Sequence, residues 1–143
     1  MIRHAGLLAR RIEGDWRGVL IEGPSGSGKS DLALRCLDAG WTLVADDRTL
    51  LWTCQGRLYG RAPDTLAGLV EARGLGVVPA PARPFAEVRL VVECAPPDAV
   101  ERVPEPEARF LLGVCVPSLR LAALEASATA KLGRALTYLG VRP

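Results

Sequence analysis

Lysine and histidine are scarce in this chain of 143 residues. Its 18 basic residues include only two lysines, Lys29 and Lys131, and its one histidine is His4. The net charge is only +2, whereas nucleic-acid-binding domains usually carry a strong basic excess. We therefore expect no nucleic-acid partner. Because lysine is so rare here, the presence of Lys29 in a glycine-rich segment points to a function for that segment.

Cysteine is also limited to four residues, none of which form a C-x-x-C pair. With a single histidine available, a structural zinc site or a disulfide framework is not expected. The alternative is that the cysteines are small, mostly buried apolar side chains. They are Cys36, Cys54, Cys94 and Cys115.

Long apolar runs are missing, although 49% of the residues are hydrophobic. A membrane-spanning helix needs about 18 or more consecutive apolar residues, so no membrane association is expected. The first 15 residues turn charged quickly and lack a small-residue cleavage site, so we predict a cytoplasmic protein. The length suits one domain, residues 1–143, with one sizeable core.

One segment stands out, "GPSGSGKSD", which fits the phosphate-loop pattern G-x-x-x-x-G-K-[ST]. An apolar stretch over 18–23 predicts a strand before it, and apolar spacing over 29–39 predicts a helix after it, with Gly40 ending that helix. Such a helix points its free N–H groups and its positive dipole end at phosphates. Lys29 is expected to reach the terminal phosphates, and Ser30 to ligate Mg²⁺. The predicted nucleotide-binding residues are Gly23, Pro24, Ser25, Gly26, Ser27, Gly28, Lys29 and Ser30.

The rest of the chain predicts an α/β fold with a mixed central sheet around the phosphate-loop strand. Strands are expected over 42–45 and 88–94, a hairpin over 49–59 with its turn at 55–56, and one or two strands in 112–121. Residues 64–78 suggest a short helical or irregular piece, then a glycine-rich turn into a strand. Residues 96–108 form an exposed connection, and 123–139 a closing helix.

Two adjacent carboxylates, Asp46 and Asp47, follow the strand predicted over 42–45. The carboxyl ends of strands in α/β sheets are where ligands bind. One carboxylate there can hold Mg²⁺ or its water, and the neighbouring charge raises the proton affinity of the other, which suits it to accept a proton. The segment "EARGLG", beginning at Glu71, suggests a shaped loop forming one wall of the same cleft.

These three segments together, "GPSGSGKSDLALR", "LVADD" and "GRAPDTLAGLVEARGLGVV", resemble the catalytic core of the HPr kinase/phosphorylase family. The likeness is to a short proteobacterial form without the N-terminal domain, and it covers nearly the whole chain. It implies a PEP carboxykinase-like phosphate-loop architecture. It also implies an ATP- and Mg²⁺-dependent serine kinase that acts on a small HPr-type carrier of a phosphotransferase system, in a homo-oligomer that the family would make a hexamer.

The resemblance also implies individual roles. Lys29 would stabilise the β- and γ-phosphates, and Asp47 would take the proton from the substrate serine. The metal would be held by Ser30, Asp46 and Glu71. His4 matches the family's histidine near the aspartate, although a longer hairpin over 9–16 separates it from the glycine loop. The later catalytic arginine would be Arg102, with Arg109 as the rival.

The chain departs from the family near its C-terminus. Where the long form has a proline–arginine–glycine–arginine–asparagine-like stretch associated with the reverse phosphorylase reaction, this chain has "VPSLRLAALEAS". Arg120 could stand in for one basic group, so kinase activity is the firmer expectation. Two alternatives stay open: a non-catalytic ATP-binding sensor, and a small-molecule kinase, whose mobile lid would need several late arginines.

Overall fold

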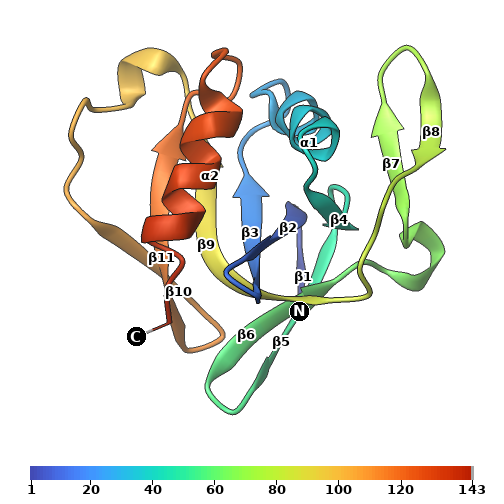
Figure 1. Cartoon of the computed structure of the whole chain (residues 1–143), viewed down its shortest axis with the longest axis horizontal. Helices are drawn as coiled ribbons and strands as arrows, with labels where there is room; N and C mark the ends of the chain where they lie inside the picture. The colour runs from blue at the N-terminus through green and yellow to red at the C-terminus, as the bar shows by residue number, and fades with distance from the viewer. Residues whose placement is uncertain (143) are drawn as a thin grey trace.

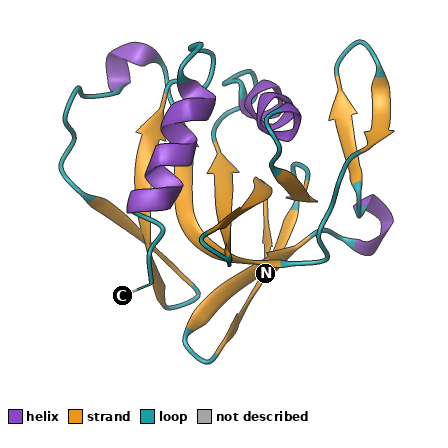
Figure 2. Cartoon of the chain, viewed as in Figure 1, coloured by secondary structure: helices purple, strands orange, loops and turns teal. Residues whose placement is uncertain are grey.

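The computed structural model describes residues 1–142 and consists of a curled mixed sheet with two α-helices packed against it (Figures 1 and 2). The elements are β1 (Ile2–Arg3), β2 (Gly6–Ile12), β3 (Asp15–Glu22), α1 (Lys29–Asp38), β4 (Thr42–Ala45), β5 (Thr49–Cys54), β6 (Arg57–Arg61), η1 (Asp64–Leu66), β7 (Leu69–Ala72), β8 (Gly76–Pro79), β9 (Ala86–Cys94), η2 (Pro97–Ala99), β10 (Glu107–Leu111), β11 (Val114–Leu121) and α2 (Ala128–Tyr138).

Strand β3, which leads into the glycine loop, lies inside the sheet in the order β1-β5-β6-β9-β3-β2-β4. It pairs in parallel with β9 and antiparallel with β2, and β9 pairs in parallel with β11 on its other edge. The predicted mixed sheet around the phosphate-loop strand is therefore confirmed. Because β3, β9 and β11 run in one direction, the loops that follow them meet at one end of the sheet.

The two faces of the sheet carry separate cores. On one face, α1 and α2 bury apolar side chains against alternate residues of β3 and β9, and Leu32, Leu132 and Ile21 are almost completely inaccessible. The other face closes around Leu20, Leu51 and further residues of the β5–β6 hairpin. Strand β3 is buried on both faces, which explains its continuous apolar sequence.

The predicted hairpins form as expected, and their turns have the backbone that tight hairpins need. Residues Glu13 and Gly14 join β2 to β3 with φ of 52° and 77°, and Gln55 and Gly56 join β5 to β6 with φ of 51° and 76°. Positive φ at both central residues matches the twist of the flanking strands. The β2–β3 hairpin is the longer one expected between His4 and the glycine loop.

Two expectations about local structure need correction. Helix α2 begins at Ala128 rather than 123, because 122–128 make successive tight turns, with Glu125 N–H bonded to the Ala122 carbonyl and Ala128 N–H to that of Glu125. Residues 69–79 form a complete hairpin, β7–β8, because Val70 and Ala72 turn one face inward.

The expectation of buried cysteines is wrong for two of the four. Cys36 and Cys94 are buried, whereas Cys54 and Cys115 are exposed on strands near hairpin turns. Strand residues alternate between faces, and these two positions fall on the outside.

No helix in residues 1–142 is long and apolar enough to cross a membrane.

Candidate active site

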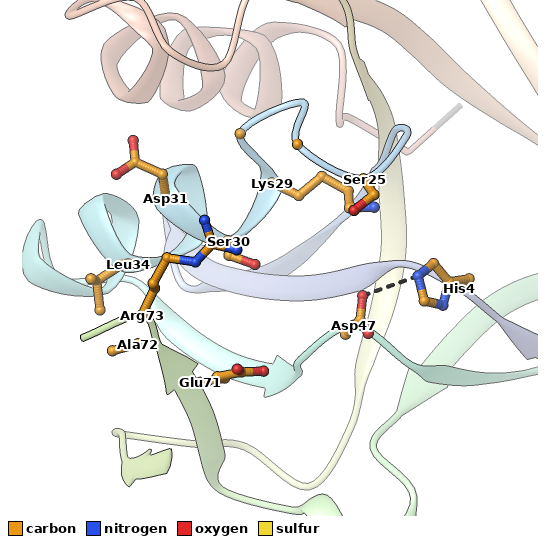
Figure 3. A pocket seen from close by; sticks show the side chains of 12 residues that line it. His4, Ser25, Lys29, Ser30, Asp31, Leu34, Asp47, Glu71, Ala72 and Arg73 are labelled. Atoms are coloured by element: carbon orange, nitrogen blue, oxygen red, sulfur yellow. Dashed lines mark ion pairs between the residues drawn. The ribbon is translucent and has the colours of Figure 1, made fainter. Parts of the chain in front are cut away.

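A cavity of about 510 Å³ lies between the glycine loop, the end of β4 and the β7–β8 hairpin (Figure 3). It brings together segments that are far apart in the sequence, including the N-terminal His4 and the hairpin residues 71–73. The lining residues are His4, Ser25, Gly26, Gly28, Lys29, Ser30, Asp31, Leu34, Asp47, Glu71, Ala72 and Arg73.

The glycine loop has a backbone that side chains would not tolerate at two positions. Gly28 has φ of 98° and is the left-handed residue from which α1 starts. A Cβ at Gly23 would lie 2.7 Å from Ser27 Oγ and 3.0 Å from Cys94 Cβ, so the loop packs too closely for any other residue there. The amide of Ser27 donates to the Pro24 carbonyl at 3.1 Å and closes the turn.

Lys29 and Ser30 open α1 on the side of the cavity. The Lys29 ammonium donates to the carbonyl of Gly23 across the loop, and Lys29 lines the cavity. Ser30 and Asp46 also border a small hollow of about 20 Å³ behind the cavity, a space near that of one water molecule. Ser30 at the start of α1 and Asp46 after β4 thus line the same hollow from two elements.

The two aspartates differ because the backbone turns sharply between them. Asp47 has φ of 65°, in the left-handed region that Asp adopts more readily than most residues, and the Arg48 amide donates to the Asp46 carbonyl at 2.7 Å. Asp46 is half-buried, whereas the Asp47 side chain is 56% exposed and lines the cavity. Backbone strain of this kind concentrates at functional sites.

His4 is the immediate partner of Asp47. Its Nε2 lies 3.3 Å from Asp47 Oδ1, and the imidazole is 68% exposed at the rim of the cavity (Figure 3). His4 follows β1, which pairs with β5, and this pairing brings the start of the chain beside the turn after β4. The placement agrees with the position predicted for this histidine.

Asp46 connects the β4 end to the β7–β8 hairpin. Its Oδ2 accepts a hydrogen bond of 2.9 Å from the backbone N–H of Glu71. Burial raises the pKa of Asp46, the Glu71 amide bond lowers it, and the carboxylates of Asp47 and Glu71 raise it further, so its pKa lies above the usual range. A divalent cation would relieve this accumulation of negative charge.

The predicted metal residues are of the kind that Mg²⁺ binds, a hydroxyl and two carboxylates. Among residues 1–142, no group of three or more His, Cys, Asp or Glu side chains is placed to bind a metal ion by itself. Mg²⁺ does not require one, because it commonly uses one or two carboxylates together with substrate phosphates and waters. Ser30 and Asp46 share the small hollow, and Glu71 lines the adjoining cavity.

The two candidate late arginines lie outside this cavity. Arg102 is exposed in the connection between η2 and β10, and its predicted role gains no support from this position. Arg109 on β10 donates to Glu22 Oε2 at 2.6 Å and to Glu93 at 3.4 Å, and the Glu22 bond raises the pKa of Arg109. It therefore anchors the end of β3.

Sequence reasoning missed four lining residues, Asp31, Leu34, Ala72 and Arg73. Asp31 and Leu34 follow Ser30 on the exposed side of α1, so helical spacing from the phosphate loop could have found them. Arg73 was part of a noted segment but received no role. In the view of Figure 3 its side chain extends toward the start of α1, and both Arg73 and Ser30 line the cavity.

Most of the chain matches a known protein family. The model of the HPr serine kinase C-terminal domain family matches residues 11–122. The chain belongs to this family. The match covers the glycine loop, both aspartates and the β7–β8 hairpin, which together with His4 build the cavity.

Relatives and a solved structure agree with this assignment. The chain is 44% identical over 64 residues to the HPr kinase/phosphorylase of Clostridium tetani and 50% identical over 62 residues to that of Bordetella pertussis. These segments cover 45% and 43% of this chain, but the chain spans only about a fifth of each relative. The HPr(Ser) kinase/phosphatase of Coxiella burnetii superposes with a TM-score of 0.78 at 25% identity, over 96% of this chain and 87% of that one.

Proposed function

We propose that this protein is an ATP- and Mg²⁺-dependent protein serine kinase that phosphorylates a small HPr-type phosphocarrier. Family membership supports the reaction class, and the cavity supports the assignment of roles. The observation that carries the proposal is the position of Asp47. Its exposed carboxylate shares one cavity with the loop suited to hold the phosphates of the donor.

The loop residues would bind and position the donor. Amides at the start of α1 and the Lys29 ammonium face the cavity, where they would neutralise the charge on the transferred phosphoryl group. Ser30, Asp46 and Glu71 would hold Mg²⁺, which would supply further charge neutralisation on the phosphate oxygens. Phosphoryl transfer depends on this positioning and electrostatic stabilisation more than on covalent chemistry.

Asp47 would accept the proton of the attacking serine hydroxyl. A carboxylate is a sufficient base because the hydroxyl loses its proton late in a loose transition state. His4, at 3.3 Å, would orient the Asp47 carboxylate. Because both side chains are more than half exposed, a serine on the surface of a carrier protein can reach Asp47 without the site having to open.

The reverse, phosphate-dependent reaction has weaker support. Residues 122–125, in the region where the family's long form has its basic stretch, are two alanines, a leucine and a glutamate. Arg120 is exposed on β11 and does not line the cavity. We therefore propose kinase activity as the main function, in a protein that acts in the cytoplasm.

The test is transfer of label from ATP to an HPr-type carrier in the presence of Mg²⁺. Acid-stable label on a carrier serine is expected with the natural protein and is expected to be lost in Asp47→Asn. Asn is used because it tolerates the left-handed backbone of residue 47. Asp38→Asn, at the exposed end of α1, is the matched control and should transfer label normally. Tight ATP binding without transfer to any carrier would contradict the kinase assignment and favour the sensor.

A further inference from the structure

A second cavity, of about 530 Å³, lies on the opposite side of the glycine loop from Asp47. It is bounded by the loop, by the segment after β9 and by the segment after β11, and we call it the β9–β11 cavity. It shares Ser25 and Gly26 with the first cavity, so a ligand on the loop can extend into both. The lining residues are Pro24, Ser25, Gly26, Ser27, Cys94, Ala95, Pro96, Pro97, Ala122, Ala123, Leu124 and Glu125.

The lining of this cavity is almost free of charge. Its only ionisable carboxylate, Glu125, is already paired with Lys131 at 2.9 Å. Burial raises the pKa of the Cys94 thiol to about 11, so this wall stays neutral at physiological pH. The first cavity, in contrast, is lined by Lys29, Asp47 and other charged groups. The two sides of the loop therefore suit two different parts of one ligand.

The wall formed by 122–125 is held in place before any ligand arrives. The Arg35 guanidinium of α1 donates to the backbone carbonyls of Ala123 and Glu125. The amide of Ala95 donates to the Leu121 carbonyl at 2.9 Å and ties the two segments together. A pocket that needs no rearrangement binds its ligand at a lower entropic cost.

The phosphate loop touches this wall directly. A Cβ at Gly28 would lie 2.8 Å from Leu124 Cδ2 and 3.2 Å from the Ala123 Cβ. The cavity thus begins where the phosphate-binding backbone ends. It also lies at the carboxyl ends of β9 and β11, the parallel neighbours of β3, where sheets of this kind bind the remainder of a ligand.

We infer that the β9–β11 cavity holds the purine base and ribose of the nucleotide whose phosphates occupy the glycine loop. The inference rests on the proposed function, because it assumes a nucleotide donor. The base is a flat, largely apolar group without charge, and the neutral lining of alanines, prolines and Leu124 matches it. The γ-phosphate end then points into the first cavity, toward Asp47.

The first test compares the binding of MgATP and Mg-tripolyphosphate by isothermal titration calorimetry. The two ligands have the same number of phosphates, but only ATP has a base and ribose. We expect ATP to bind at least ten-fold more tightly. Equal affinities would overturn the base site and leave the phosphate loop intact. Failure of both ligands to bind would overturn the base site and the proposed donor together.

The second test uses a bulky side chain at the exposed rim of the cavity. Pro97→Trp should place an indole in the space for the base and reduce ATP affinity at least ten-fold, with tripolyphosphate affinity unchanged. Ala99→Trp, exposed two residues away and outside the lining, is the matched control and should bind both ligands normally. A parallel loss of both ligands in Pro97→Trp, or no loss of either, would contradict the assignment.

Photolabelling with 8-azido-ATP, followed by mapping of the modified peptide, locates the base directly. The azide is on the base, so label is expected within residues 94–97 or 122–125. Excess ATP should suppress the labelling. Label within 71–73, on the Asp47 side of the loop, would overturn the inference.

Discussion

The imidazole of His4 lies 3.3 Å from the carboxylate of Asp47, although the two residues are 43 positions apart in the chain. The contact depends on β1, which is only two residues long, pairing with β5. Both side chains are largely exposed, so the pair contributes little to stability. Its place at the rim of the first cavity is the basis of the orienting role that we propose for His4.

Replacing His4 should therefore impair catalysis without affecting folding. We expect His4→Ala to lower kcat for carrier phosphorylation about ten-fold or more, with the Kd for ATP unchanged, because Asp47 loses the group that orients it. His4→Gln, which can still donate one hydrogen bond, should recover part of the rate. Kinetics at saturating ATP and a thermal melt measure this. A melting temperature lowered along with kcat would show that His4 acts on folding instead.

The ionised Asp46 carboxylate should lower the free energy of unfolding at neutral pH, compared with an uncharged side chain at the same position. A carboxyl whose pKa is raised on folding contributes stability below its unfolded pKa and loses it as the pH rises through the folded pKa. Asp46→Asn should therefore raise the melting temperature, with a gain that is absent near pH 3.5 and grows toward pH 7. The variant should also need more Mg²⁺ for activity. A gain independent of pH would contradict this account.

Two glycine substitutions should have opposite effects on the free energy of unfolding. Gly28→Ala forces a side chain into the left-handed region and against Leu124, and should cost about 1–2 kcal/mol. Gly133→Ala, inside α2, should stabilise the protein by about 0.5–1 kcal/mol. Its Cβ would lie 3.2 Å from the end of the long Arg10 side chain, which can shift, and at an ordinary contact distance of 3.9 Å from Trp41. Urea unfolding of both variants, with the same m-value as the parent, provides the comparison.

Arg17 is a buried arginine whose replacement should destabilise the fold. Its buried guanidinium donates to the carbonyls of Leu136 and Thr137 at the end of α2, at 3.1 and 2.9 Å, and to Asp15. Arg17→Met leaves these acceptors without their donor and should cost about 3 kcal/mol or more. The exposed Arg57→Met is the control and should change stability by less than about 0.5 kcal/mol. Equal effects would show that the buried bonds contribute nothing specific.

Much of the site was predictable because its signals are local. The glycine loop, its strand and its helix follow one another directly, and the paired aspartates follow β4 without a gap. Local spacing fixes such units, since hydrogen bonds and apolar periodicity act over a few residues. The start of α2 was misplaced because Arg35, a residue of another helix, holds the carbonyls that precede it.

The sequence alone determined the phosphate loop, the mixed α/β class and the presence of two carboxylates at a strand end. Only the tertiary structure decided that Asp47 faces the cavity while Asp46 is half-buried, because the left-handed backbone of Asp47 turns its side chain away from that of its neighbour. It also decided that Arg109 is bound to Glu22 and that a neutral cavity adjoins the loop. These features depend on contacts between distant strands, which no local pattern encodes.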